Sequence, residues 1–172
     1  MKRGKSGGKR AGIKASDIYD SERPNVDIPD GFVMVQDTRE QLPLWQTGEY
    51  EWIIEKGLKS GDYSINGMEN IITIERKSIE DLYGSFGGGR KRFERLKARM
   101  MKMAWAGLMI EGTEDEVYTP QFYSTMGVNQ IYHAISSWEV DGIYVHYAGS
   151  KDRARDWIMS RLTRFYKHWR ER

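Results

Sequence analysis

The sequence of 172 residues contains no cysteine. This absence excludes disulfide bonds, thiolate zinc sites, iron–sulfur clusters and cysteine nucleophiles, and it is typical of a reducing compartment. No apolar run approaches the roughly 18 residues that span a membrane, and the start of the chain lacks the apolar stretch of a secretory signal. We therefore expect a cytoplasmic, intracellular protein with no membrane partner.

Positive charge is absent from a long part of the chain. Residues 103–150 contain no Lys or Arg, whereas residues 90–102 contain seven basic residues and a single acid. The formal net charge is only +2, so a near-neutral total hides a polarised chain. Such segregation suits a protein that presents a cationic surface to nucleic acid, whose phosphates dominate the binding energy. A solvated helix surface explains any one basic block equally well.

The two ends of the sequence differ in composition. Residues 1–16 hold six basic side chains, four glycines and no acid, so they lack the apolar residues needed for a core. We predict a disordered basic N-terminal arm over residues 1–28 and one folded domain over residues 29–172. No internal repeat and no second domain are indicated.

Hydrophobic periodicity predicts alternating strands and helices after the arm. Ser78 followed by Asp81 resembles a helix N-cap, and Asn66-Gly67 favours a tight hairpin turn. We expect strands at residues 32–36, 50–55, 63–65, 71–76, 107–110 and 143–147, and helices at 78–83, 90–105, 128–138 and 154–169. This order predicts an α/β fold with a mixed central sheet flanked by helices.

The predicted hairpin concentrates charged residues in space. Asp62 precedes its first strand, and Glu75 and Lys77 end its second strand, so pairing of the strands brings the three together. Residues two apart in a strand share a face, which separates Arg76 from its two neighbours. Asp37 follows another core strand and could join them. Three carboxylates without His or Cys predict a hard oxygen site for Mg²⁺ or Mn²⁺.

Surface salt bridges around the hairpin are the alternative explanation of this cluster. An Asp followed at a distance by Glu-x-Lys is by itself a weak signal. The apolar residues Ile71, Ile72 and Ile74 indicate that the second strand is buried. A core strand that ends in three consecutive charges favours a functional site.

Several motifs in order extend this pattern. Asp37-Thr38-Arg39-Glu40, Gly61-Asp62-Tyr63 and the block from Glu75 to Leu82 follow one another along the chain. Together they resemble the signature of the XPF-type (ERCC4-domain) structure-specific endonucleases, a branch of the restriction-endonuclease-like superfamily. The resemblance implies a nuclease domain over residues 29–172.

The resemblance implies a Mg²⁺-dependent endodeoxyribonuclease that acts at branched, forked or flapped DNA. Asp37, Asp62 and Glu75 would bind the Mg²⁺ or Mn²⁺ ion, and Lys77 would act on the water or the transition state. Arg76 and Asp81 would orient the site or touch DNA, although a local ion-pair lattice explains them equally well. The expected DNA contacts are Arg39, Arg90, Lys91, Arg92, Arg95 and Arg99.

Some features depart from the family pattern. Glu94 stands where the family often has Gln. The 172 residues leave no room for the helix-hairpin-helix modules of many family members, so we expect a short stand-alone form of prokaryotic or viral type. Residues 87–89 are three glycines without the Lys-Ser/Thr of a phosphate loop, so no nucleotide cofactor is expected. A homodimer is expected by resemblance alone. A catalytically silent DNA-binding partner and a Holliday-junction resolvase remain alternative functions.

Overall fold

The structure is a computed structural model that describes residues 26–46 and 48–172. The predicted basic arm therefore lies outside the described residues, except for residues 26–28. The elements are β1 (Met34–Gln36), β2 (Ile53–Glu55), β3 (Tyr63–Ile65), β4 (Ile72–Lys77), α1 (Ile79–Phe86), α2 (Arg90–Met100), β5 (Trp105–Ile110), α3 (Glu114–Val117), α4 (Val128–Val140), β6 (Tyr144–Tyr147) and α5 (Lys151–Arg170).

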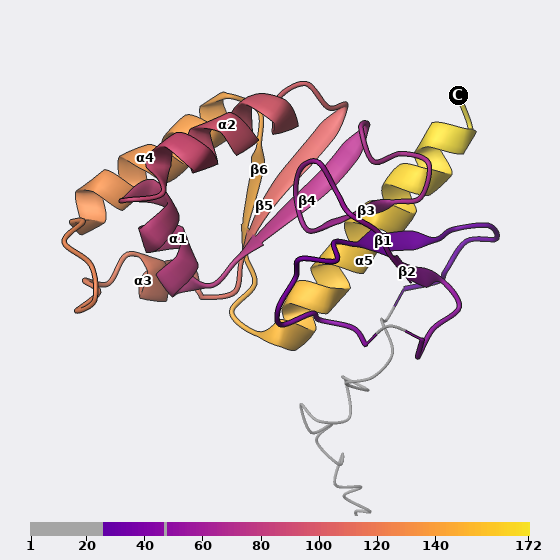
Figure 1. Ribbon diagram of the computed structural model, residues 1–172, viewed down its shortest axis with the longest axis horizontal. Coiled ribbons are helices and arrows are strands. Elements are labelled where there is room, and N and C mark those ends of the chain that lie inside the picture. Colours follow the sequence, from indigo (N-terminus) through magenta and orange to yellow (C-terminus); the bar gives the residue numbers. More distant parts are fainter. Residues whose placement is uncertain (1–25, 47) are drawn as a thin grey trace, which may run out of the picture.

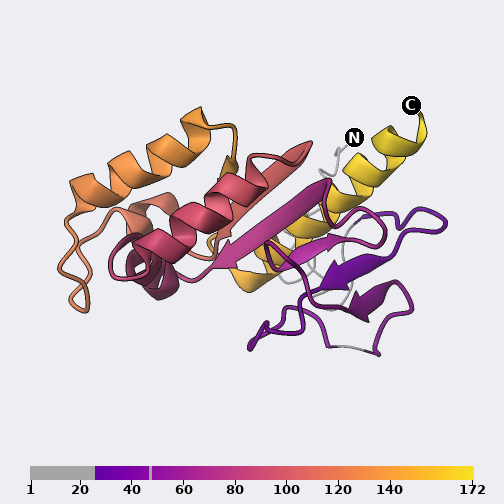
Figure 2. The ribbon, with the colours of Figure 1, turned by 45° about the horizontal axis from the view of Figure 1, so that its top comes forward.

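One mixed sheet of six strands, in the order β2-β1-β3-β4-β5-β6, organises the chain. β3 is antiparallel to both β1 and β4, whereas β4, β5 and β6 run parallel to one another. Figures 1 and 2 show the twisted sheet between two layers of helices. This architecture confirms the predicted α/β class with a mixed central sheet.

Helices cover both faces of the sheet. α1, α2 and α4 lie on one face, and α5 crosses the other (Figure 1). Neighbouring side chains of β5 point to opposite faces of the sheet. Leu108 packs in the hydrophobic core beneath α1, α2 and α4, whereas Met109 packs in the core beneath α5. Both side chains are fully buried.

The helix caps form as their residues predict, and the Asn66-Gly67 turn forms within a longer connection, residues 66–71, between β3 and β4. Gly67 closes the β3–β4 turn with φ +81°, a conformation that favours glycine. Ser78 caps α1, with its Oγ accepting from the Asp81 N–H at 3.1 Å. Ser150 caps α5 in the same way through the Arg153 N–H at 3.2 Å. These caps fix where each helix leaves the sheet.

Two elements differ from the sequence expectation. α2 ends at Met100 instead of residue 105, because Trp105 already begins β5 and pairs with Ile72. The short helix α3 was not predicted; a capping box between Thr113 and Glu116 forms it. Within the described residues, every helix is too short or too polar to cross a membrane.

Candidate active site

The β3–β4 hairpin brings Asp62 beside the end of β4. Asp62 N–H donates to the Ile74 carbonyl at 2.8 Å, next to the Tyr63–Ile74 pair of the ladder. The Asp62 carboxylate is held as well, because its Oδ2 accepts from the backbone N–H of Arg76 at 2.7 Å. Asp62 is therefore fixed to β4 through both its backbone and its side chain.

Glu75 and Lys77 extend from one face of β4, as strand alternation predicts. Lys77 Nζ lies 2.6 Å from Glu75 Oε1, and the Glu75 side chain is only 7% exposed. Burial opposes the charge on Lys77, but the adjoining Glu75 carboxylate, with the charges of Asp62 and Asp81, raises the Lys77 pKa. Burial, together with repulsion from Glu75, raises the pKa of Asp62 to about 8. Asp62, Glu75 and Lys77 thus form one electrostatically coupled group, hereafter the carboxylate–lysine cluster.

Asp37 is adjacent to this cluster through its backbone. It follows β1, and its N–H donates to the Asp62 carbonyl at 2.8 Å. The buried Asp37 carboxylate accepts from Arg39 Nε at 2.9 Å and from the Leu58 N–H at 3.4 Å. The hydrogen bond and the charge of Asp37 raise the Arg39 pKa. Two predicted site residues, Asp37 and Arg39, thus neutralise each other in this structure.

Arg76 faces away from the carboxylate–lysine cluster, on the opposite face of β4. Its Nε donates to Glu111 Oε1 at 2.6 Å, and its Nη1 lies 3.4 Å from Glu40 Oε1. Nη1 also donates to the Leu42 carbonyl at 2.5 Å. Arg76 therefore holds the loop after β1 against the end of β5, which is the ion-pair lattice that the sequence left open.

Asp81 lies outside the buried cluster. Its exposed carboxylate accepts from Ser78 Oγ at 2.8 Å, within the cap of α1. Its negative charge still contributes to raising the Lys77 pKa, as the smallest of the named effects, after Glu75 and Asp62. The observed contacts give Asp81 a capping role beside the cluster.

Helix α2 contacts the carboxylate–lysine cluster at Lys77 and the turn before the cluster at Ser60. Lys77 Nζ is 5.6 Å from the centroid of the Phe93 ring, within range of a cation–π contact. Further along α2, Arg99 Nε donates to Ser60 Oγ at 2.8 Å, in the turn before Asp62. The basic helix and the cluster are therefore immediate neighbours.

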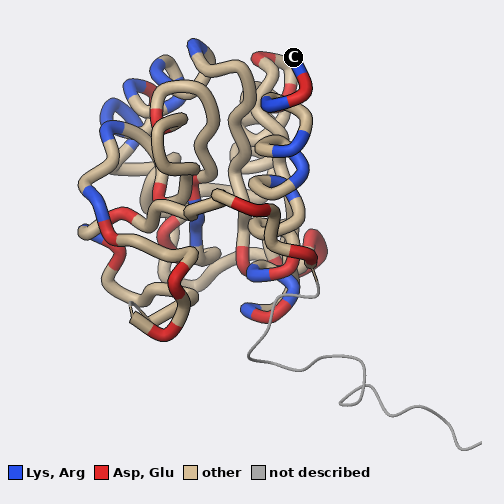
Figure 3. Tube along the Cα trace, turned by 90° about the vertical axis from the view of Figure 1, so that its right-hand side faces the viewer, with Lys and Arg blue, Asp and Glu red and all other residues tan. Residues whose placement is uncertain are grey.

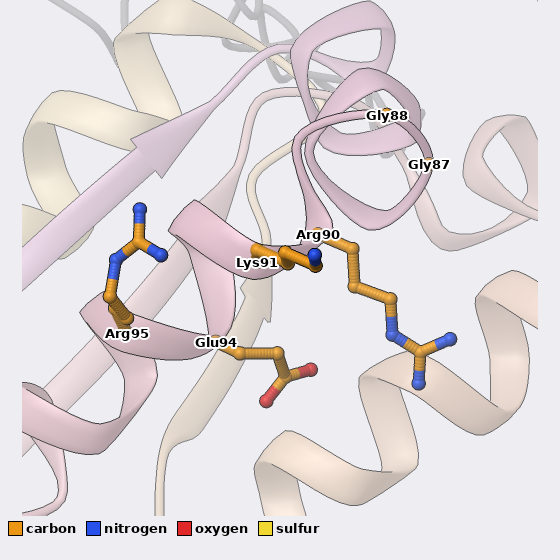
Figure 4. A pocket seen from close by; sticks show the side chains of 6 residues that line it. All are labelled: Gly87, Gly88, Arg90, Lys91, Glu94 and Arg95. Atoms are coloured by element: carbon orange, nitrogen blue, oxygen red, sulfur yellow. The ribbon is translucent and has the colours of Figure 1, made fainter.

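The outer side of α2 is an exposed basic face, made of Arg90, Lys91, Arg92 and Arg95. In the described part of the chain, none of the four has an acidic partner within 4.0 Å. Three of them border an open depression of about 760 Å³ next to Gly87 and Gly88, where Arg90 and Arg95 point in different directions (Figure 4). Figure 3 shows further Lys and Arg along α5. The cations of α2 are spread out, which suits successive phosphates better than one bound anion.

The donors of the cluster fit a hard divalent cation in chemistry. Asp62 and Glu75 repel each other in the same buried volume, and a cation between such carboxylates would relieve that repulsion. In the described ranges, however, no three His, Cys, Asp or Glu residues are grouped as metal ligands. The carboxylate of Asp37, the third predicted metal ligand, pairs with Arg39 in this structure.

The sequence alone did not single out three residues that shape this region. Glu111 directly follows β5, and the rule that adjacent parallel strands end at one edge could have placed it near Arg76. Lys97 falls on the same helical stripe as Phe93 and Met100, and it is buried, with Nζ 2.5 Å from Asp141 Oδ2. For Ser60, the buried partner of Arg99, no sequence signal was available.

Comparisons with solved structures show which proteins have a similar fold. XPF from Aeropyrum pernix has 21% sequence identity and a TM-score of 0.58, covering 77% of this chain and 60% of that one. A structure described as XPF from Aeropyrum pernix in complex with DNA has 20% identity and a TM-score of 0.58, covering 80% of this chain. This chain spans 66% of that second chain. A search of curated proteins gives no significant match.

These likenesses confirm the restriction-endonuclease-like fold that the motifs predicted. The family model of the ERCC4 domain matches residues 34–160, from β1 into α5, and includes the whole carboxylate–lysine cluster. The chain therefore belongs to the ERCC4 domain family, a family of structure-specific DNA nucleases.

Proposed function

We propose that the protein is a divalent-metal-dependent DNA endonuclease that hydrolyses phosphodiester bonds at branched, forked or flapped DNA. The observation that carries this proposal is the convergence of Asp62, Glu75 and Lys77 next to the basic helix α2. Mutually repelling carboxylates in a buried place serve no structural need, and they suit a site that receives a cation. The DNA-bound relative, XPF from Aeropyrum pernix, supports DNA as the substrate.

In this proposal each residue has a role that follows from its position. Asp62 and Glu75 would hold Mg²⁺ or Mn²⁺, with Asp37 as a third ligand once its carboxylate leaves Arg39. When bound, such a cation would polarise the phosphodiester and lower the pKa of the attacking water. The Lys77 ammonium, oriented by Glu75, would stabilise the negative charge that develops on the phosphate oxygens. The exposed basic face of α2 would bind backbone phosphates on either side of the cut.

One observation favours a second candidate, a catalytically silent DNA-binding module. Asp37 is neutralised by Arg39 and Glu75 pairs with Lys77, so of the three predicted metal ligands only Asp62 has no cationic side chain within 4.0 Å among the described residues. A module of this kind would keep the basic face of α2 but would not cut DNA. Resolution of four-way junctions is a further variant within the nuclease class. A homodimer remains a prediction of the family resemblance.

Cleavage of end-labelled flap, fork, four-way junction and duplex DNA tests the proposal, with Mg²⁺, Mn²⁺ or EDTA. Glu75→Ala should lower the rate more than about 100-fold, because even groups that only support a metal ligand contribute about 10–100-fold. Lys77→Ala should lower the rate about 10²–10³-fold, as for other groups that stabilise transition-state charge. Both variants should still bind DNA.

Glu139→Ala is the matched control, because it removes an exposed carboxylate from α4, away from the cluster. Its rate should equal that of the unmodified protein. Binding of all four DNAs without cleavage of any of them would instead support the silent module. Cleavage that is unchanged in Glu75→Ala would rule out the proposed site.

A further inference from the structure

Arg99 contacts a buried group of the protein near the end of α2. Its Nε donates to Ser60 Oγ at 2.8 Å, and Ser60 is only 3% exposed. The sequence pattern placed Arg99 with Arg92 and Arg95 as a phosphate contact. All three residues are exposed, but Arg99 differs in its hydrogen bond, because one side of its guanidinium is already bound by the turn that leads to Asp62.

The same turn is packed against β4 on its other side. Thr73 Oγ1 donates to the Ser60 carbonyl at 2.8 Å. A Cβ atom on Gly61 would lie 2.0 Å from that Thr73 oxygen, so the backbone of the turn touches β4 directly. Asp62 then joins the ladder through the Ile74 carbonyl at 2.8 Å. Ser60 and Gly61 are thus held between β4 and Arg99, immediately before Asp62.

Helix α2 also contacts the carboxylate–lysine cluster, where Phe93 meets Lys77. Residues 93 and 99 are six positions apart, or about 9 Å along a helix. Helix α2 therefore contacts the cluster directly at Lys77, and it contacts the turn before Asp62 at Ser60. A shift of α2 along its axis would disturb both, and the Ser60 hydrogen bond opposes such a shift.

We propose that Arg99 is a positioning residue: through Ser60 it fixes the turn before Asp62, and so the Asp62 carboxylate, relative to Lys77. This inference rests on the proposed nuclease function. It predicts that Arg99 acts mainly on the rate of the chemical step and little on DNA affinity. Misplacement of a reacting group by about 1 Å can cost about 100-fold in rate, so the loss of one such bond is measurable.

The test compares Arg99→Ala, Ser60→Ala and the double variant, with Arg99→Lys as the conservative change. Lys102→Ala is the matched control, since it removes one exposed positive charge just beyond the end of α2. Three quantities are measured: the single-turnover cleavage rate at saturating DNA, the Kd for DNA in EDTA, and the exchange rate of the Asp62 amide hydrogen in the free protein. The last needs neither metal nor DNA.

We expect Arg99→Ala and Ser60→Ala each to lower the cleavage rate about 10-fold or more, with Kd changed less than about twofold. The double variant should be no slower than Arg99→Ala, because both changes remove the same bond. Arg99→Lys should recover part of the rate, and Lys102→Ala should keep all of it. Exchange of the Asp62 amide should accelerate in Arg99→Ala and Ser60→Ala only.

Other results would overturn the inference. A raised Kd with an unchanged rate in Arg99→Ala would make Arg99 an ordinary phosphate contact, and additive losses in the double variant would separate it from Ser60. If the unmodified protein cuts no DNA, the proposed nuclease function fails. The exchange rate of the Asp62 amide then tests the positioning role of Arg99 without any cleavage assay. Unchanged exchange at Asp62 in Arg99→Ala would refute the positioning role, whereas faster exchange would support it.

Discussion

Asp37 and Asp62 are joined through their backbones, with the N–H of Asp37 donating to the carbonyl of Asp62 at 2.8 Å. Their carboxylates nevertheless have different partners: Arg39 binds that of Asp37, and the Arg76 N–H binds that of Asp62. The backbone bond holds Asp37 next to Asp62, which suits the role of third ligand that we propose for it. The side chain of Arg39 is 66% exposed, so the pair can open without disturbing the core.

The first prediction concerns Arg39 and metal affinity. Arg39→Ala removes a cation that competes for Asp37, so Mn²⁺ should bind about two- to fivefold more tightly, because the arginine of this ion pair is exposed and solvent weakens the pair. Calorimetric titration of the DNA-free protein with Mn²⁺ measures this. Glu75→Ala should abolish the same binding signal. Weaker Mn²⁺ binding in Arg39→Ala would show that Arg39 supports the site instead of competing with it.

The second prediction concerns the basic face of α2. A protein that neutralises DNA phosphates loses affinity steeply as salt rises, because counterions are released on binding. Arg95→Ala should reduce the slope of log K against log salt by about 1, and Arg95→Lys should preserve it. Fluorescence anisotropy with labelled duplex over a range of salt concentrations measures the slope. An unchanged slope in Arg95→Ala would remove Arg95 from the DNA-binding surface.

The third prediction concerns the turn before Asp62. In Gly61→Ala the new Cβ would lie 2.0 Å from Thr73 Oγ1 and 2.9 Å from the Ile74 carbonyl, at φ +74°. Crowding and the left-handed backbone together should lower the free energy of unfolding by about 3 kcal/mol. Gly67→Ala is the control, because its φ is +81° but nothing lies within 4 Å, so about 1 kcal/mol is expected. Urea unfolding that gives equal losses would contradict the close packing at Gly61.

The fourth prediction concerns pH. Burial, together with the charge of Arg161, lowers the pKa of His146, whose ring stacks on Trp157 at 4.7 Å. Below about pH 6.5, His146 is protonated in the unfolded chain but binds a proton less readily in the folded protein. The free energy of unfolding therefore decreases as pH falls through this range. His146→Gln should flatten this part of the stability profile. Urea midpoints at pH 7.5 and 5.5 test this; an equal decline in both proteins would exclude His146 as the cause.

Much of the fold follows from local residue patterns. The hairpin, the caps at Ser78 and Ser150, and the separation of Arg76 from Glu75 and Lys77 all depend on residues close in sequence. Neighbouring side chains of a strand point to opposite faces of the sheet, so Arg76 must face away from Glu75 and Lys77. These features could therefore be predicted without knowledge of the tertiary structure.

Features that depend on long-range packing could not be predicted in this way. The partners of Arg76 include Glu111, 35 residues away, and Arg99 meets Ser60 across 39 residues. The basic stripe of α2 looked uniform in sequence, yet Arg99 bonds to the protein whereas Arg95 borders an open depression. The competition of Arg39 for Asp37 is also invisible in sequence, because the same motif allows both the ion pair and the metal ligand.

The position of α5 has a consequence for how the protein folds during synthesis. Arg155 donates to the Leu44 carbonyl at 2.7 Å across 111 residues, and α5 supplies Ile158, Met159 and Leu162 to the core beneath β1 and β3. Contacts of such sequence separation form late, after a large loop has closed. A nascent chain that has not yet released α5 from the ribosome leaves the strands beside Asp37 and Asp62 uncovered. The carboxylate–lysine cluster faces α2 on the other side of the sheet, so its hairpin can pair before α5 is translated, whereas the face of β1 and β3 that α5 covers stays open until then.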